Sequence, residues 1–289
     1  MLVYGEMMLR LDRRKIGEET GMKQYRTSGG PMAHGESGSG SKDPLVLLHA
    51  FPLNHRMWAP QVRALSGERR VITPDYPGFG RSPRPCAQPD VRHYAEGVRE
   101  LLDALHLERV ALGGLSMGGY VAFACLRLFP ERISSLVLAN TRPDPDTEEA
   151  RETRRELARQ VTEEGVEILP DLQMGRLLSR ATLDGKPDVV EDVRSMILES
   201  SPDGVVAALG ALRDRPDSTE ELGEIEVPTL VVGGQEDAIS TPEVMEAMAA
   251  KIPDSRYVTL PNAGHLSNLE APEEFNAALA GFLARVWAG

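Results

Sequence analysis

The chain has 289 residues, which suits one α/β domain with an insertion or at most two domains, and 41% of them are hydrophobic, as in globular proteins with a sizeable core. Its formal net charge of −12 at pH 7 argues against a nucleic acid or an anionic membrane as partner, because either would require a basic patch. Two cysteines, Cys86 and Cys125, make no disulfide framework, no apolar run approaches a membrane span, and no cluster of Cys, His and carboxylates has metal-ligand spacing.

Short apolar segments recur along the chain and predict buried strands. Residues 45–48 (Leu-Val-Leu-Leu) form a continuous apolar run, as expected for a central parallel strand. The other predicted strands are residues 70–74, 109–112, 133–139, 229–234 and 256–260. Apolar residues at helical spacing predict a helix over 92–105, and a closing helix is expected over 272–286. Strands that alternate with helices predict a mostly parallel, doubly wound sheet covered on both faces.

The alternation stops after Asn140, and residues 144–222 contain no convincing strand. Asp146 and Glu149 have the spacing of a capping box at the start of a helix. Further helices are predicted over 166–178, 188–198 and 203–212. Because this segment lies between two core strands, we expect residues 144–222 to form a helical cap, inserted into a core made of residues 22–143 and 223–289.

The segment Gly-Gly-Leu-Ser-Met-Gly-Gly at residues 113–119 lies between a predicted strand and a predicted helix. A strand, a Gly-x-Ser-x-Gly turn and a helix are the context of a nucleophile elbow. The turn is so tight that Ser116 must adopt a strained backbone, and the small residues Gly114 and Gly118 let strand and helix approach each other. The strain exposes the hydroxyl above the sheet, and the following helix directs the positive end of its dipole at the site.

Four further motifs accompany the elbow, each directly after a predicted strand. They are His-Ala-Phe-Pro at 49–52, Asp-Tyr-Pro-Gly-Phe-Gly-Arg-Ser at 75–82, Gly-Gln-Glu-Asp at 234–237 and Gly-His at 264–265. In this order, and from about Met22 to the C-terminus, they resemble the α/β-hydrolase superfamily. The resemblance implies the α/β-hydrolase fold and an N-terminal hairpin of residues 23–27 and 31–36, with Met22 as the natural start. Residues 1–21 are then expected to be a disordered or mis-assigned extension, in which charges interrupt any signal-peptide core.

The resemblance also assigns catalytic roles. Ser116, Asp237 and His265 would form a catalytic triad in the chain order of this superfamily, with Glu236 as the competing carboxylate. Each follows a predicted strand, so all three are expected at the carboxyl edge of one sheet. His265 would take the proton of Ser116 during attack and return it to the leaving group, while Asp237 would hold the imidazole tautomer. This chemistry requires neither a cofactor nor a metal.

The turn at residues 49–52 is expected to carry the oxyanion hole. By the resemblance, the backbone N–H groups of Phe51 and Met117 would stabilise the oxyanion. Ala50 replaces the glycine usual in this turn, which is tolerable if its φ stays negative. His49 is interpreted as a structural brace of the loop.

The predicted reaction is hydrolysis of a small or medium carboxylic ester (EC 3.1.1 type) through an acyl-enzyme. A serine at the elbow excludes the dehalogenases and epoxide hydrolases of this fold, which need a carboxylate there. The sequence Gly-Leu-Ser-Met-Gly-Gly resembles the elbows of small bacterial carboxylesterases and of 3-oxoadipate enol-lactonases. The alternatives are therefore such an enol-lactonase or a related lactonase, a cofactor-free perhydrolase (haloperoxidase), and a non-catalytic ligand sensor on the same fold.

Trp58, Arg142, Ile239 and Leu266 are the residues expected to contact a small-molecule ester or lactone. Trp58 could line the acyl pocket or belong to the core. Arg142 could bind the carboxylate of an enol-lactone, or pair with acidic residues of the cap such as Asp144. The missing signal sequence leads us to expect a cytoplasmic protein, while the oligomeric state and the physiological substrate stay open.

Overall fold

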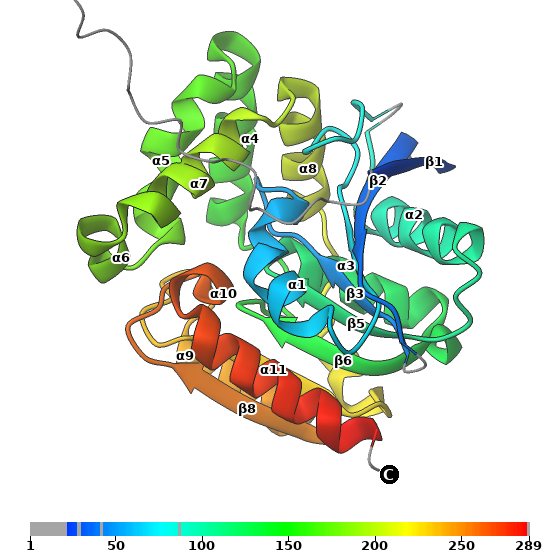
Figure 1. Ribbon diagram of the computed structural model, residues 1–289. Coiled ribbons are helices and arrows are strands. Elements are labelled where there is room, and N and C mark those ends of the chain that lie inside the picture. Colours follow the sequence, from blue (N-terminus) through cyan, green and yellow to red (C-terminus); the bar gives the residue numbers. More distant parts are fainter. Residues whose placement is uncertain (1–21, 28–29, 41–42, 86–87, 288–289) are drawn as a thin grey trace, which may run out of the picture.

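In the computed structural model, the described part of the chain comprises residues 22–27, 30–40, 43–85 and 88–287. The predicted extension 1–21 and Cys86 lie outside it. Eight strands form one sheet in the order β1-β2-β4-β3-β5-β6-β7-β8 (Figure 1). The β1–β2 and β2–β4 pairs are antiparallel, and every pair from β4 through β8 is parallel. This arrangement confirms the mostly parallel sheet that the sequence predicts.

The central strands are buried on both faces, which explains their continuous apolar runs. The strands are β1 (Lys23–Thr27), β2 (Gly30–Ser37), β3 (Leu45–Leu48), β4 (Val71–Pro74), β5 (Val110–Leu115), β6 (Ile133–Ala139), β7 (Thr229–Gly234) and β8 (Ser255–Leu260). All residues of β3 through β7 are buried, whereas the edge strands β1 and β8 are partly exposed. The predicted N-terminal hairpin is present as the antiparallel pair of β1 and β2.

Helices cover both faces of the sheet. On one face, α1 (Ala59–Leu65) packs against α11 (Pro272–Trp287), and on the other α2 (Val91–Ala104) packs against α3 (Met117–Leu128) (Figure 1). A 3-10 turn over His55–Trp58 precedes α1, the short helix α10 spans Ser267–Glu270, and α9 (Pro242–Lys251) packs on β7 and β8. None of the described helices has the length and apolar character that a membrane crossing requires.

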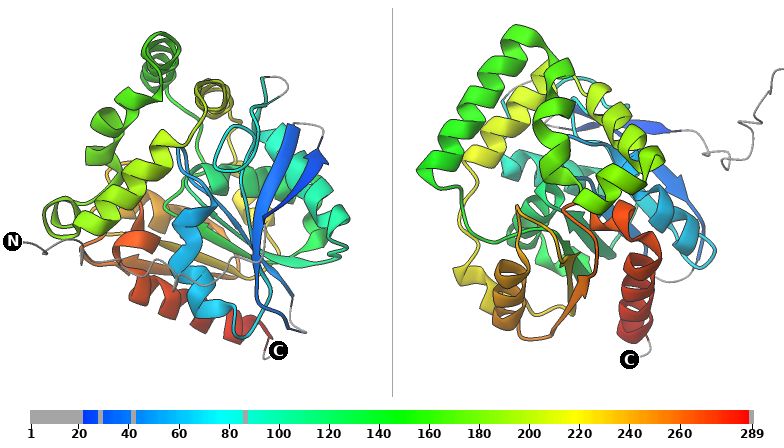
Figure 2. Two further views of the ribbon diagram at one scale, coloured as in Figure 1. Left: turned by 45° about the horizontal axis from the view of Figure 1, so that its top comes forward. Right: turned by 90° about the vertical axis from the view of Figure 1, so that its left-hand side faces the viewer.

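Five helices lie between β6 and β7 in the chain and gather over one end of the sheet (Figure 2). They are α4 (Glu148–Glu164), α5 (Leu169–Leu177), α6 (Arg180–Gly185), α7 (Pro187–Leu198) and α8 (Pro202–Arg213). No strand interrupts them, since every residue from 144 to 222 belongs to the described part of the chain. We call these five helices the helical cap.

The helical cap differs from the sequence prediction in three details. The helix predicted over 166–178 is a 3-10 turn at Val166–Ile168 followed by α5, and α6 was not predicted. The capping box predicted at Asp146 is wrong, because Thr147 is the N-cap of α4 and accepts the N–H of Ala150. The carboxylate of Asp146 instead forms ion pairs with Arg154 and Arg215.

Asp146 and Arg215 anchor the helical cap to the core. The side chains of both are nearly inaccessible to solvent, and the Arg215 guanidinium lies 4.3 Å from the centre of the Tyr120 ring on α3. Burial alone would raise the pKa of Asp146, but hydrogen bonds and charge attraction from Arg154 and Arg215 lower it below its usual value. A paired buried charge of this kind holds α4 and α8 against the elbow helix.

Candidate active site

Ser116 occupies the turn between β5 and α3, with φ 54° and ψ −112°. A positive φ is unfavourable for a residue with a Cβ atom, so the surrounding packing must hold it in place. A Cβ atom on Gly114 would lie 2.2 Å from the carbonyl oxygen of Gly118, so a larger residue at 114 would separate strand from helix. The local structure is therefore the strained strand–turn–helix that the sequence predicts.

Asp237 and His265 form a buried pair at the ends of β7 and β8. The Nδ1 atom of His265 lies 2.9 Å from one carboxylate oxygen of Asp237 and 3.0 Å from the other. An ionised carboxylate only accepts hydrogen bonds, so Nδ1 is the donor and Nε2 is left free to accept a proton. Both side chains are almost completely buried.

Further donors hold the Asp237 carboxylate. Its Oδ1 accepts the N–H groups of Ile239 (2.8 Å) and Ser240 (3.0 Å), and its Oδ2 accepts the Asn140 side-chain amide (2.9 Å). Burial alone would raise the pKa of Asp237, but charge attraction and a hydrogen bond from His265, with hydrogen bonds from Asn140 and Ser240, lower it below its usual value. Asp237 is thus kept as an anion beneath the imidazole.

Asn140 links this carboxylate to the histidine loop, the segment 261–266 between β8 and α10 that carries His265. It lies directly after β6 with φ 43°, is fully buried, and also donates to the carbonyl oxygen of Gly264 at 3.1 Å. The hydroxyl of Ser267 donates to the Asn140 side-chain oxygen at 2.5 Å. Sequence reasoning missed this residue, although its place after a core strand marks the same sheet edge as Ser116.

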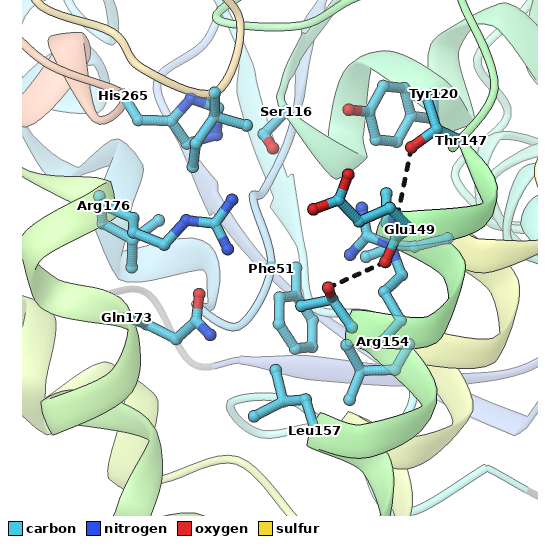
Figure 3. Close-up of a pocket in the computed structure, with 16 residues that line it drawn as sticks. Phe51, Ser116, Tyr120, Thr147, Glu149, Arg154, Leu157, Gln173, Arg176 and His265 are labelled. Atoms are coloured by element: carbon cyan, nitrogen blue, oxygen red, sulfur yellow. Dashed lines mark hydrogen bonds between the residues drawn. The ribbon is translucent and has the colours of Figure 1, made fainter.

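Ser116 and His265 open onto one cavity of about 350 Å³ between the sheet edge and the helical cap (Figure 3). The cavity is roofed by Leu157, Leu177, Leu209 and Leu212, and Phe51 and Tyr120 lie on the core side. Polar residues of the cap also line it, namely Thr147, Glu149, Thr153, Arg154, Gln173 and Arg176. The lining is thus mixed, with an apolar roof and six polar side chains of the cap facing Ser116 and His265.

Phe51 and Met117, whose amides the sequence analysis expects to form the oxyanion hole, lie in the loop after β3 and at the start of α3. Met117 is the first residue of α3, so its N–H is one of the free donors at a helix start. Within the described residues, neither this amide nor that of Phe51 donates to another group. Ala50 avoids the positive φ that would have demanded glycine.

His49 braces the loop in which Phe51 lies. Its Nδ1–H donates to the carbonyl oxygen of Ala50 at 2.9 Å, and its Nε2 accepts the N–H of Tyr76 at 3.1 Å. Complete burial lowers the pKa of His49 to about 4, so the ring is neutral at pH 7. A neutral ring with both nitrogens engaged supports the structural interpretation made from the sequence.

The expected substrate-binding residues divide into two groups. Ile239 lines the cavity, whereas Trp58, Arg142 and Leu266 do not. Trp58 is buried in the core, where its ring packs against Phe275 with 6.0 Å between the ring centroids. Leu266 is likewise completely buried.

Arg142 is engaged by Asp144 rather than free to hold a substrate. Its Nε donates to one carboxylate oxygen of Asp144 at 2.9 Å, and its Nη2 contacts the other. The hydrogen bond raises the pKa of Arg142 above its ordinary value. Of the two roles that the sequence left open for Arg142, the structure therefore shows the pairing with an acidic residue.

The roof of the cavity comes from residues that the sequence could not assign. Leu177 and Leu209 belong to apolar faces that were expected either to pack or to line a pocket, and both are nearly inaccessible to solvent. Leu172, on the same helix as Leu177, is instead 46% exposed. Tyr120 had a usable signal, since position i+4 from Ser116 shares its helix face.

Within the described residues, no group of His, Cys, Asp and Glu could hold a metal ion.

A mostly parallel sheet with a helical insertion over the strand ends is the α/β-hydrolase fold. A family model described as alpha/beta hydrolase fold matches residues 43–272, and the chain belongs to this family. A thermophilic esterase from Thermogutta terrifontis, solved with malate bound, is 40% identical with a TM-score of 0.88, over 92% of this chain and 99% of that one.

Two enol-lactonases are also similar. The enol-lactonase from Burkholderia xenovorans LB400 is 29% identical with a TM-score of 0.85, over 91% of this chain and 100% of that one. The 3-oxoadipate enol-lactonase 1 of Acinetobacter baylyi is 31% identical over 243 residues, which cover 84% of this chain and 89% of the relative.

Proposed function

We propose that this protein is a serine hydrolase that cleaves small to medium carboxylic esters through an acyl-enzyme. The observation that carries the proposal is the shared cavity of Ser116 and His265, with the imidazole held from behind by Asp237. The Ser116 hydroxyl would attack the ester carbonyl while Nε2 of His265 takes its proton. Donation of that proton to the departing alcohol would leave the acyl-enzyme, which water would then hydrolyse by the reverse proton transfers. The amides of Phe51 and Met117 would stabilise both tetrahedral oxyanions.

The cavity supports a short acyl chain. A volume of about 350 Å³ lies at the lower end of the range for small-molecule pockets, roughly 300–1,000 Å³. Its roof is formed by leucines of the helical cap, which favour an apolar chain over a charged one at that end. The similar esterase from Thermogutta terrifontis is consistent with ester cleavage.

With p-nitrophenyl esters from acetyl to dodecanoyl, we expect kcat/KM to peak at short acyl chains. Leu177→Ala should shift that optimum to longer chains, because it removes part of the roof. Leu172→Ala, on the same helix but exposed and outside this cavity, is the matched control and should keep the original optimum. A profile that Leu177→Ala leaves unchanged would show that the acyl chain binds elsewhere.

A second candidate, hydrolysis of an ester or lactone that carries a free carboxylate, is favoured by Arg176. The guanidinium of Arg176 extends from α5 into the cavity beside Gln173 (Figure 3). The other lining arginine, Arg154, is paired with Asp146. By contrast, Arg176 makes no ion pair with any residue that the structure describes, so it can offer its donors to a substrate anion. The similar enol-lactonases are consistent with this candidate.

Arg176→Ala is expected to lower kcat/KM about 10- to 100-fold for the p-nitrophenyl monoester of glutaric acid, the usual range for a hydrogen bond to a charged group. The neutral p-nitrophenyl valerate should change little. Arg180→Ala removes the same charge from an exposed residue outside the cavity, where Arg180 pairs with Asp184, and serves as the control. Equal losses on the two esters would reject Arg176 as the carboxylate-binding residue.

A further inference from the structure

Glu270, the last residue of α10, is a buried carboxylate between the helical cap and the loop that carries His265. Only 1% of its surface is exposed. Its Oε1 accepts the N–H of Gly264 at 3.0 Å and that of Leu266 at 3.3 Å, so it holds the residues on both sides of His265. Its Oε2 accepts the N–H of Ser179 at 2.7 Å, at the start of α6 in the cap.

Additional hydrogen bonds join the same two segments. The N–H of Leu266 also donates to the carbonyl oxygen of Leu177 at 3.1 Å. The Ser179 hydroxyl donates to the carbonyl oxygen of Asn262 at 3.3 Å, and the Lys186 ammonium donates to the main-chain oxygen of Glu270. Cap residues 177–186 are thus bonded to residues 262–270 at both ends of the histidine loop.

The contact between the two segments is close. A Cβ atom on Gly264 would lie 2.7 Å from the nitrogen of Ser179 and 3.1 Å from Oε1 of Glu270. Neither segment can therefore shift alone without breaking hydrogen bonds to a buried carboxylate, which is costly where water cannot replace them. Leu177, two residues before Ser179, lines the cavity roof. The same contact therefore controls the positions of both His265 and this wall of the cavity.

We propose that Glu270 is a positioning residue that fixes the helical cap to the histidine loop, so that His265 and the Leu177 wall keep one relative placement. It acts through His265 and does not touch the substrate. The inference rests on the proposed function in that His265 is taken as the general base. It deepens that function, because one side chain then controls both the rate and the acyl-chain selectivity.

Glu270→Gln tests this proposal, since it keeps the volume but turns an N–H₂ group toward backbone N–H donors. We expect kcat per active site, counted by the p-nitrophenol burst, to fall about 100-fold, as for a catalytic group displaced by about 1 Å. The preference for short acyl chains should also broaden, and the low-field proton resonance of the His265 Nδ1–H should shift. Glu273→Gln, an exposed glutamate on α11, is the matched control and should behave as wild type.

A purely structural role predicts a different result. Glu270→Gln would then lower Tm but leave kcat per titrated site, chain preference and the proton resonance unchanged, which would overturn the proposal. If that variant does not fold, Glu270→Asp decides, because it keeps the charge but draws the carboxylate back by one methylene from the N–H groups of Gly264, Leu266 and Ser179. A broader chain preference in Glu270→Asp supports the proposal, and a wild-type preference rejects it.

Failure of the proposed function would be seen separately. It would appear as wild-type protein that neither turns over any ester nor is labelled at Ser116 by a phosphonate. The proton resonance would still report in that case whether Glu270 controls the orientation of His265.

Discussion

Ser116→Ala is expected to reduce ester turnover about a millionfold, the scale measured when a triad serine is removed elsewhere. In the proposed mechanism the acyl bond forms on the hydroxyl of Ser116, which lies on the strained turn at φ 54°, and alanine has no group that can replace it. Folding should be little affected, because alanine and serine meet the same backbone strain. The measurement is the p-nitrophenol burst with a short-chain ester, together with labelling by a fluorescent phosphonate.

Ser195→Ala provides the control for this experiment. Ser195 lies on α7, outside the cavity, and its hydroxyl bonds only to Arg56 and Glu199 among the hydrogen bonds of the described residues. Its burst and labelling should equal those of wild type. A Ser116→Ala protein that still gives a burst would rule out Ser116 as the nucleophile and show that the acyl group forms on another residue.

Asp237→Asn is expected to lower kcat about 10,000-fold, by analogy with the same change in a serine protease. Both oxygens of Asp237 accept hydrogen bonds, from Ile239 and Ser240 on one side and Asn140 on the other. An amide group at either position therefore faces a donor, and the imidazole loses the partner that fixes its tautomer. Glu236→Gln is the matched control, since Glu236 is exposed and should leave kcat unchanged.

The pH dependence of stability gives this variant a second readout. The pKa of Asp237 is lower in the folded protein than its ordinary value of about 3.9. A depressed pKa contributes stability that is present above the unfolded value and lost as pH falls through the folded one. The stability gap between wild type and Asp237→Asn should thus be widest above about pH 4 and shrink below it. A gap that stays constant into acid would mean that the charge of Asp237 is not what stabilises the site.

Local rules were sufficient for much of the candidate site. The elbow could be predicted because only small residues at 114 and 118 permit its tight turn, and this constraint is written in the sequence itself. The pairing of Asp237 with His265 followed from two motifs at the ends of neighbouring strands. His49 could be interpreted correctly because it belongs to the turn rather than to the cavity.

Local sequence rules could not predict which side chains contact each other across the fold. Whether Trp58 packs on Phe275 or lines the pocket depends on segments far apart in the chain. The same limit applied to Asp146, which has the spacing of an N-cap but is drawn away by Arg215, 69 residues later. An ion pair with a distant guanidinium outweighed a local hydrogen bond.

The sequence by itself determined the class of fold and the order of Ser116, Asp237 and His265, because buried parallel strands need continuous apolar runs and the turns after them need particular residues. The tertiary structure alone decided the shape and charge of the cavity. Its leucine roof and Arg176 come from helices whose apolar faces suit several packings equally well. The bonds of Glu270 to Ser179 and to both neighbours of His265 depend on that packing too, since a carboxylate reaches three distant amides only after the cap has docked.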